Sequence, residues 1–326
     1  MTNRLVQRGA GFLGAKRWRF IQRSGLANRT INREVDVIDL ASVSSAGIAT
    51  GRLDLTTAEY RAFVASPALA WYACRPHPQA KPLEYLTTTR LLNLADGDTV
   101  LDAAGGTSRE YPESLRAATG KTVEFICQDS QLEGTVRDGM RFVGGSIDEL
   151  PLADNSIDAI SCHHSMEHFR GDTDVRFVRE MIRLLKPGGR LVVVPLFLGT
   201  KYAELWNRRP ETAAAADGAV QIVDRLGSFC GWGPYEHFAR VYSLDAFRTR
   251  LLETIGDTAR AEVVGVYLDG APTPSRAQRL PTTGQRPHEG PRADEDDRPI
   301  RSVAAPDDRH EVGFVLGLGH VAVGSQ

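Results

Sequence analysis

The chain has 326 residues, of which 42% are hydrophobic and 25% are charged, and its formal net charge is -2. A chain of this size and composition can bury a sizeable core, as one large α/β domain with additions or as two small domains. The balanced charge provides no basic field for nucleic acid, and no apolar run is long enough to span a bilayer.

The four cysteines are Cys74, Cys127, Cys162 and Cys230, and they form no CxxC pair. Free thiols in a reducing compartment are the simplest interpretation of this spacing. The N-terminus has no continuous apolar stretch of the kind that a secretory signal needs. We therefore expect a cytoplasmic protein.

Residues 1–33 form a basic N-terminal tail. No acidic residue occurs there, whereas eight arginine and lysine residues are interleaved with large apolar ones such as Phe12, Trp18 and Phe20. The apolar spacing fits a helical stripe poorly, which favours a flexible tail. A peripheral contact with anionic lipid, a clamp for a phosphorylated substrate and an organelle transit peptide are the alternatives.

Residues 34–98 are predicted to be an N-terminal helical cap and lead-in. Thr56 precedes a predicted helix at residues 58–65, and a second helical pattern at residues 83–94 stops at Asp96-Gly97. The cap would sit on the amino-terminal side of the remaining domain.

From residue 99 onward, predicted strands and helices alternate. The strands are 99–102, 123–127, 142–143, 157–162, 191–196, 262–268 and 312–316, and the helices are 109–119, 175–185 and 243–254. Such alternation predicts an α/β fold with a doubly wound, mostly parallel sheet and helices on both faces. Residues 99–326 would be one domain, in which residues 270–309 form a long flexible loop.

The stretch VLDAAGGTS, residues 100–108, lies between a predicted strand and a predicted helix. Open α/β sheets bind ligands at this edge. Ala103, Ala104, Gly105 and Gly106 are small enough for a ligand to lie against the main chain. The stretch lacks the GxGxxG of a dinucleotide fold, which disfavours NAD, and a tight turn without a ligand is the alternative.

Asp129 follows the second predicted strand, in the sequence ICQDS. In nucleotide-binding α/β folds an acid at this position accepts hydrogen bonds from the ribose hydroxyls. A solvated loop acid is the alternative, so Asp129 alone does not identify a nucleotide site and further motifs are needed.

The run from Thr99 to Leu196 resembles the class I S-adenosylmethionine-dependent methyltransferases, in particular those that act on small molecules. The family's segments occur in order: an acid followed by alternating glycines at Asp102, Ala104, Gly106 and Ser108, an acid at Asp129, GDxxxLPF at 145–152, SFDLV at 156–160, LEHL at 166–169 and LKPGGRL at 185–191. Alanine and serine replace two of the glycines. Six segments in order are far more specific than a single glycine motif.

The resemblance implies a Rossmann-like, seven-stranded sheet and S-adenosyl-L-methionine as the cofactor. The implied cofactor-binding residues are Asp102, Ala103, Ala104, Gly105 and Gly106 for the methionine part, Asp129 and Ser130 for the ribose, Ser146 and Ile147 for the adenine, and His163 beside the sulfonium. Ser146 stands where the family usually has aspartate, and its hydroxyl can accept the same hydrogen bond without a charge.

Methyl transfer is expected to be an in-line displacement in which the protein aligns the reactants and excludes water. If the acceptor is a hydroxyl, a base should take its proton, and His164, His168 and His237 are the catalytic candidates. Each of the three can instead be a structural hydrogen-bonding histidine.

His164 to His168 also spell HxxEH, an inverted zinc-protease signature. Two histidines four residues apart on a helix can share a metal ion. Because this motif begins directly after a strand, we expect no metal site and keep zinc hydrolysis as a minor alternative.

Residues 231–247 follow the fifth strand of this domain, where related enzymes place a substrate-facing loop. The aromatic and imidazole side chains there either contact a ligand or pack the following helix; they are Trp232, Tyr235, His237 and Tyr242. Trp71, Tyr72 and Tyr85 from the lead-in form either a lid or part of the core.

We predict methyl transfer to a small-molecule, sugar or glycolipid acceptor, with oxygen as the accepting atom. No nucleic-acid partner is expected, and the oligomeric state stays open. The rival hypothesis is a non-catalytic binding or scaffold protein, which the departures at Ala104, Ser108 and Ser146 favour.

Overall fold

The computed structural model describes residues 35, 38–132, 134–137, 139–206, 216, 218–223, 238–273 and 312–318. The predicted basic tail at residues 1–33 lies outside these residues, as does most of the predicted loop at residues 270–309.

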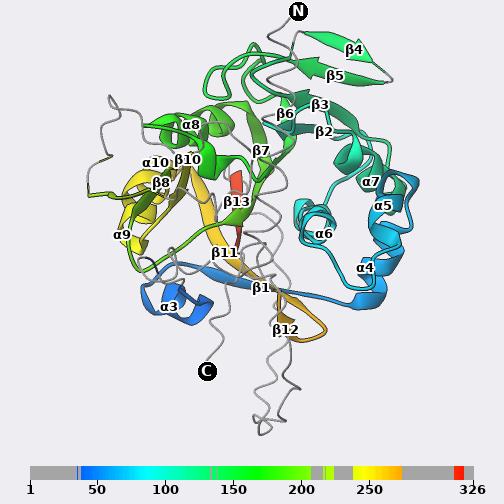
Figure 1. The fold of residues 1–326 in the computed structure, drawn as a ribbon. Coiled ribbons are helices and arrows are strands. Elements are labelled where there is room, and N and C mark those ends of the chain that lie inside the picture. The colour runs from blue at the N-terminus through cyan, green and yellow to red at the C-terminus, as the bar shows by residue number, and fades with distance from the viewer. Residues whose placement is uncertain are drawn as a thin grey trace, which may run out of the picture.

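The described residues form a central ten-stranded sheet that runs through the middle of the molecule (Figure 1). Its strands are β1 (Thr50–Leu55), β2 (Thr99–Ala103), β3 (Glu124–Gln128), β4 (Thr135–Arg137), β5 (Met140–Val143), β6 (Ile157–His163), β7 (Leu185–Leu196), β11 (Ala259–Leu268), β12 (Ala271–Pro272) and β13 (Val312–Leu318). The order is β1-β11-β13-β7-β6-β2-β3-β5-β4, with β12 beside β11. Only the β4–β5 and β11–β12 pairings are antiparallel among these, so the predicted mostly parallel, Rossmann-like sheet is confirmed.

The sheet is wider than the seven strands that the resemblance implied. β1 adds a parallel edge beside β11, and the short strands β4 and β12 pair with β5 and β11. In β1, which has the sequence TGRLDL, Leu55 is the one buried residue. Strands this short or this polar carry little hydrophobic alternation, and the sequence therefore did not predict them.

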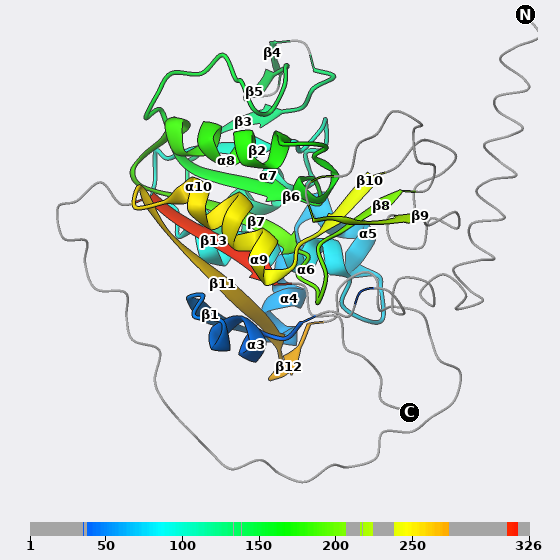
Figure 2. The same ribbon diagram turned by 90° about the vertical axis from the view of Figure 1, so that its left-hand side faces the viewer.

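Helices cover both faces of the sheet, as the two views in Figures 1 and 2 show. One layer contains α4 (Thr57–Val64), α5 (Ala70–Ala73), α6 (Ala80–Leu92) and α7 (Glu110–Thr119), and the other contains α3 (Leu40–Ser45), α8 (Thr173–Leu184), α9 (Leu244–Phe247) and α10 (Glu253–Ile255). A π-helical turn at Arg248–Leu252 joins α9 to α10. Each layer buries its own core, with Phe63, Leu86 and Leu115 in the first and Phe177, Met181 and Phe247 in the second.

The start of α4 shows how the sequence determines a helix boundary. The Glu59 amide donates to the Thr56 hydroxyl at 3.1 Å, and the Thr56 amide donates to the Glu59 carboxylate at 2.8 Å. This reciprocal capping box satisfies two amides that the first turn leaves without helical partners. The helix predicted after Thr56 is therefore confirmed.

The N-terminal helical cap expected at residues 34–98 is not confirmed as a separate unit. β1, which belongs to this segment, is an edge strand of the central sheet. α4 and α6 pack on the sheet as part of one layer with α7. The segment is thus built into the sheet and its covering layer.

A second, three-stranded sheet lies beyond the carboxyl end of β7 (Figure 2). It contains β8 (Ala203–Trp206), β9 (Val220–Val223) and β10 (Phe238–Val241), in the order β10-β8-β9. The sequence predicted no strand here, and placed residues 238–241 in a substrate-facing loop. All four residues of β8 and of β10 are buried, so neither strand has the alternation that marks a strand with one exposed face.

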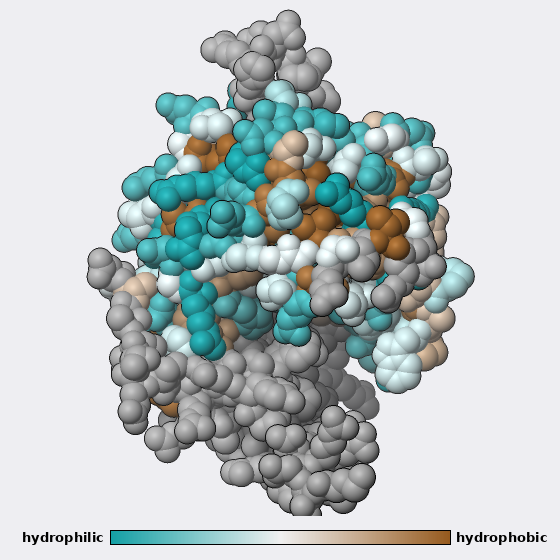
Figure 3. All heavy atoms as spheres, turned by 90° about the horizontal axis from the view of Figure 1, so that it is seen from above, coloured by the Kyte–Doolittle hydropathy of each residue, from teal (hydrophilic) through white to brown (hydrophobic). Residues whose placement is uncertain are grey.

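The surface seen from above Figure 1 is mainly hydrophilic, with separate hydrophobic areas between the polar ones (Figure 3). Among the residues that the structure describes, the large apolar side chains that stay exposed are Trp71, Val136, Val220 and Val223. No helix in the described part of the chain has the length and hydropathy needed to cross a membrane.

Candidate functional site

The loop after β2 bends closely around the carboxylate of Asp102. This side chain is 4% exposed and accepts a hydrogen bond from the Ser161 hydroxyl at 2.9 Å. A Cβ atom added to Gly105 would lie 2.1 Å from Oδ2 of Asp102. Glycine is therefore required at position 105, because no side chain fits between the main chain and this buried acid.

Two further residues of the loop adopt left-handed backbone conformations, Ala104 with φ 53° and Gly106 with φ 69°. A left-handed backbone is unfavourable for alanine, and it persists where contacts with the surrounding structure impose it. The Ala104 amide donates to Oε1 of Gln128 at 2.9 Å, and the Gly105 amide donates to the Gln128 carbonyl at 3.0 Å. These contacts hold the strained turn in place.

Gln128, which the sequence analysis did not identify, connects three loops of the site. Besides its bonds to the β2 loop, its side-chain amide donates to the Gly145 carbonyl at 2.9 Å. It is 1% exposed. The one signal in the sequence is its place directly before Asp129, at the end of the second buried strand.

Asp129 faces the loop after β2, as the resemblance implies. Its Oδ2 would lie 3.8 Å from a Cβ added to Gly106, and its Oδ1 accepts a hydrogen bond from the Gln131 amide at 3.0 Å. Ser130, beside it, is exposed. The residues implied for the methionine part and the ribose thus lie on two loops that face each other.

The Ser146 hydroxyl donates to the carboxylate of Asp148, which also pairs with Arg176 at 2.6 Å. Burial would raise the pKa of Asp148, but the bonds from Ser146 and Arg176 outweigh it and lower that pKa. The Ser146 hydroxyl keeps its lone pairs as acceptors, and the neighbouring Ile147 is 6% exposed. Ser146 can therefore accept a hydrogen bond from the edge of an adenine, and Ile147 has the apolar side chain that its face would require.

His163, at the end of β6, is anchored inside the molecule. Its Nε2 lies 2.9 Å from the Thr88 hydroxyl and its Nδ1 lies 3.6 Å from Oδ1 of Asp102. The rings of Tyr85 and Tyr111 approach it edge-on, with centroids 5.0 Å and 4.5 Å away. Tyr85 is thus a core residue here, and His163 connects α6 to the loop after β2.

His164 follows with a left-handed backbone, φ 49°, and points both ring nitrogens at carboxylates. Nε2 lies 2.5 Å from Oε2 of Glu84, and Nδ1 lies 3.6 Å from Oε1 of Glu167. Burial would lower the pKa of His164, but the two carboxylates outweigh burial and raise it to about 10. His164 is therefore an imidazolium at neutral pH. Glu84, 80 residues away in the sequence, was not foreseen.

The HxxEH segment begins directly after β6 and ends on a single 3-10 turn, η3 (Met166–His168), and it does not lie on a long helix. His168 has its Nδ1 2.6 Å from the Phe238 carbonyl and its Nε2 3.7 Å from Oε1 of Glu167. No group of three or more His, Cys, Asp or Glu side chains that could hold a metal ion occurs in the described residues.

The other residues that were expected to contact the substrate lie in different environments. His237, Trp232 and Tyr235 lie outside the described residues. Tyr242 is 1% exposed, and its hydroxyl donates to Asp174 at 2.8 Å, so it packs the strand onto α8. Trp71, by contrast, is 67% exposed.

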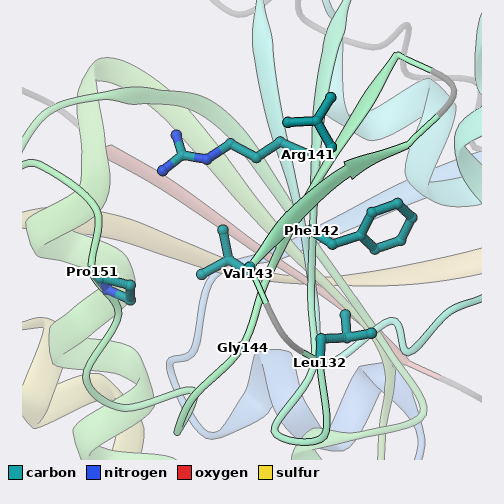
Figure 4. Close-up of a pocket in the computed structure, with 8 residues that line it drawn as sticks. Leu132, Arg141, Phe142, Val143, Gly144 and Pro151 are labelled. Atoms are coloured by element: carbon teal, nitrogen blue, oxygen red, sulfur yellow. The ribbon is translucent and has the colours of Figure 1, made fainter.

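A cavity of about 640 Å³ opens beside β5, at the edge of the sheet that carries Asp129 (Figure 4). Its lining residues are Leu132, Gly134, Val136, Arg141, Phe142, Val143, Gly144 and Pro151. None of the expected cofactor-binding residues is among them. The cavity adjoins the site through Gly144, two residues before Ser146, but does not coincide with the loops that face each other.

The loops after β2, β3, β5 and β6 therefore converge at one edge of the sheet. Gly106 leaves the main chain open, and Asp129 and Ser146 present acceptors on the neighbouring loops. These donor and acceptor groups fit the nucleoside that the resemblance implies. The roles of the individual residues stay predictions.

Comparison with known proteins gives the following matches. A family model described as a methyltransferase domain matches residues 112–193. A demethylmenaquinone methyltransferase from Corynebacterium glutamicum is 34% identical over an alignment of 163 positions that covers 47% of this chain and 69% of that protein. A ubiquinone/menaquinone biosynthesis C-methyltransferase from Azotobacter vinelandii is 34% identical over an alignment of 117 positions that covers 33% of this chain and 46% of that protein.

Among solved structures, the chain is similar to a 1,6-didemethyltoxoflavin-N1-methyltransferase from Burkholderia thailandensis. The identity is 14%, the match covers 68% of this chain and 83% of that chain, and the TM-score is 0.37. A TM-score this low supports no conclusion about this chain. The relationship therefore depends on the sequence matches.

Proposed function

The chain belongs to the class I S-adenosylmethionine-dependent methyltransferases, and we propose that it methylates a hydroxyl group of a small-molecule acceptor. The observation that carries this proposal is a group of charged and imidazole side chains that follows the end of β6. Glu84, His164, Glu167 and His168 gather there, next to the loop after β2. Such a set of charged and imidazole groups suits a hydroxylated acceptor better than an apolar one.

The residues proposed to hold S-adenosylmethionine are those that converge at the carboxyl edge of the sheet. Ala103 to Gly106 would take its methionine part, Asp129 its ribose, and Ser146 with Ile147 its adenine. When bound, the cofactor supplies an electrophilic methyl group on a sulfonium.

The protein's own contribution is a rigid arrangement. Gln128 ties the β2 loop to Gly145, and the Ser165 hydroxyl donates to the carbonyls of Ala104 at 3.1 Å and His163 at 2.9 Å. Positioning of this kind lowers the barrier to a displacement because the geometry need not be ordered during the reaction.

A sugar-containing acceptor is the first candidate, methylated at oxygen. A second candidate is a ring carbon of a quinol-like compound, because two of the relatives are named as quinone-biosynthesis methyltransferases. Methylation at oxygen releases the hydroxyl proton, whereas methylation at a ring carbon releases the proton of that carbon. The scaffold hypothesis is not favoured, since the relatives are named as enzymes. A peripheral membrane contact through residues 1–33 stays a hypothesis.

The function is tested with the purified chain, S-adenosylmethionine carrying a ¹³C-labelled methyl group, and the small-molecule fraction of a cell extract. We expect labelled product, with a methyl carbon shift of a methyl ether. A shift of an aryl methyl group would select the quinol-like acceptor instead. Cofactor binding by calorimetry with no labelled product from any fraction would contradict the proposal.

A further inference from the structure

One carboxylate oxygen of Glu167 is buried and has no hydrogen-bond partner in the described part of the chain. This oxygen is Oε2, and the Glu167 side chain is 6% exposed. A buried acceptor left unpaired costs about 1–3 kcal/mol. Such an atom is normally explained by a group that the protein binds.

The other oxygen of Glu167 is held between two histidines. Oε1 lies 3.6 Å from Nδ1 of His164 and 3.7 Å from Nε2 of His168. These contacts orient the carboxylate and leave Oε2 for an additional donor. Ser165, two residues before Glu167, donates to the Ala104 carbonyl at 3.1 Å, so the segment that carries Glu167 contacts the loop expected to hold the cofactor.

Both neighbouring histidines have each ring nitrogen directed at another group of the protein. His164 has a carboxylate at each ring nitrogen, so as an imidazolium it has no free lone pair. His168 has its Nδ1 on the Phe238 carbonyl, which fixes that nitrogen as a donor, and its Nε2 faces Oε1 of Glu167 at 3.7 Å. Glu167 offers a lone pair that no other group in the described part of the chain uses.

We infer that Glu167 is a catalytic residue that binds the acceptor hydroxyl through Oε2 and takes its proton during methyl transfer. The inference rests on the proposed function and identifies the acceptor as a hydroxyl compound. His164 and Glu84 are positioning residues that keep the carboxylate oriented.

The step balances in atoms and electrons. The acceptor O–H bond breaks and its proton passes to Oε2 of Glu167, while the freed electron pair on oxygen forms the new bond to the methyl carbon. The methyl–sulfur bond breaks with its electron pair going to sulfur, which becomes a neutral thioether. The proton on Glu167 then leaves to water when the products depart.

The decisive variant is Glu167→Gln, which keeps the shape of the side chain but is a far weaker proton acceptor. Its matched control is Glu253→Gln, which changes an exposed glutamate on α10. Each protein is measured for S-adenosylmethionine affinity by calorimetry, for melting temperature, and for tritiated methyl transfer to the small-molecule fraction of a cell extract.

We expect Glu167→Gln to bind S-adenosylmethionine within about threefold of wild type and to lose on the order of 100-fold or more in transfer rate. Glu253→Gln should match wild type in all three measurements. Transfer by Glu167→Gln within about threefold of wild type would overturn the inference while leaving the proposed function intact. A wild-type protein that transfers no label would overturn both.

If Glu167→Gln does not fold, Glu167→Asp is used, because it keeps the charge between the two histidines. Its carboxylate lies one methylene further from the acceptor, so we expect normal cofactor affinity with transfer reduced about tenfold or more. A folded Glu167→Asp variant as active as wild type would refute a direct proton-accepting role.

Discussion

Gly105 is the residue on which the shape of the cofactor loop depends most. The carboxylate of Asp102 occupies the space that a Cβ atom at position 105 would need. Asp102 cannot retreat easily, because it is buried and bonded to Ser161. The absence of a Cβ atom at position 105 thus allows the loop to approach the Asp102 carboxylate this closely.

Gly105→Ala is expected to lower cofactor affinity at least tenfold and to destabilise the fold by about 1–3 kcal/mol, since it overpacks a closed site. Calorimetry with S-adenosylmethionine and urea unfolding measure the two effects. Gly134→Ala is the control, because the nearest atom to an added Cβ there is 4.0 Å away. Equal affinities for the two variants would contradict the geometry of the loop.

The Glu84–His164 pair gives the stability of the protein a pH dependence. The pKa of His164 in the folded state, about 10, is above its ordinary value of 6.5. The pair therefore stabilises the folded state fully below pH 6.5, and that stabilisation is lost as the pH rises toward 10.

Glu84→Gln should lower the pKa of His164 and destabilise the protein by about 2 kcal/mol at pH 6, with the difference from wild type shrinking as the pH approaches 10. Histidine NMR titration and urea unfolding at several pH values provide the measurements. Thr89→Ser, a change on the same helix that keeps a hydroxyl, is the control. A pH-independent difference would show that the ion pair is not its source.

At the scale of elements, the three-stranded sheet is fixed to α8 by a buried ion cluster. Arg240 on β10 is fully buried, with Nη1 2.7 Å from Asp174 and Nη2 3.4 Å from Glu204. Its Nη2 also donates to the Gly171 carbonyl at 2.8 Å. Arg250 pairs with the same Asp174 at 2.7 Å. Charges removed from water in this way are costly to leave unpaired.

Arg240→Met should destabilise the protein by about 3 kcal/mol, because Glu204 loses its one ion-pair partner among the described residues and stays buried. Hydrogen exchange should increase first in β8 and β10. The control is Arg52→Met, which removes an exposed pair with Asp54 and should cost less than about 1 kcal/mol. Similar losses from both variants would contradict the buried role of Arg240.

The turn at Pro187-Gly188-Gly189 shows what one segment of sequence can and cannot predict. A Cβ at Gly189 would lie 2.8 Å and 2.9 Å from the backbone oxygens of Lys186 and Asp158, so the glycine is architectural, as its motif indicated. The sequence did not predict that β7 begins at Leu185, before the turn, and shifts register against β6. That pairing depends on a neighbour strand, not on local pattern.

At the scale of the whole molecule, the sequence predicted the alternating core well. β2, β6 and α8 lie where buried runs and helical periodicity indicated, because their side chains are buried in the cores on the two faces of the sheet. Gln128 and Glu84 were missed because their partners are distant in the chain or lie on the backbone. The sheet of β8, β9 and β10 was missed because its strands are short, and because β8 and β10 are buried on both sides.

The account depends on a nucleoside lying between the loop after β2 and Asp129. The most direct measurement is a crystal structure of the protein soaked with S-adenosylhomocysteine. We expect the ribose hydroxyls within hydrogen-bond distance of Asp129 and the amino-acid part along Ala103 to Gly106. A ligand bound elsewhere, in the cavity beside β5 for example, or a site that stays empty at saturating ligand, would contradict the account.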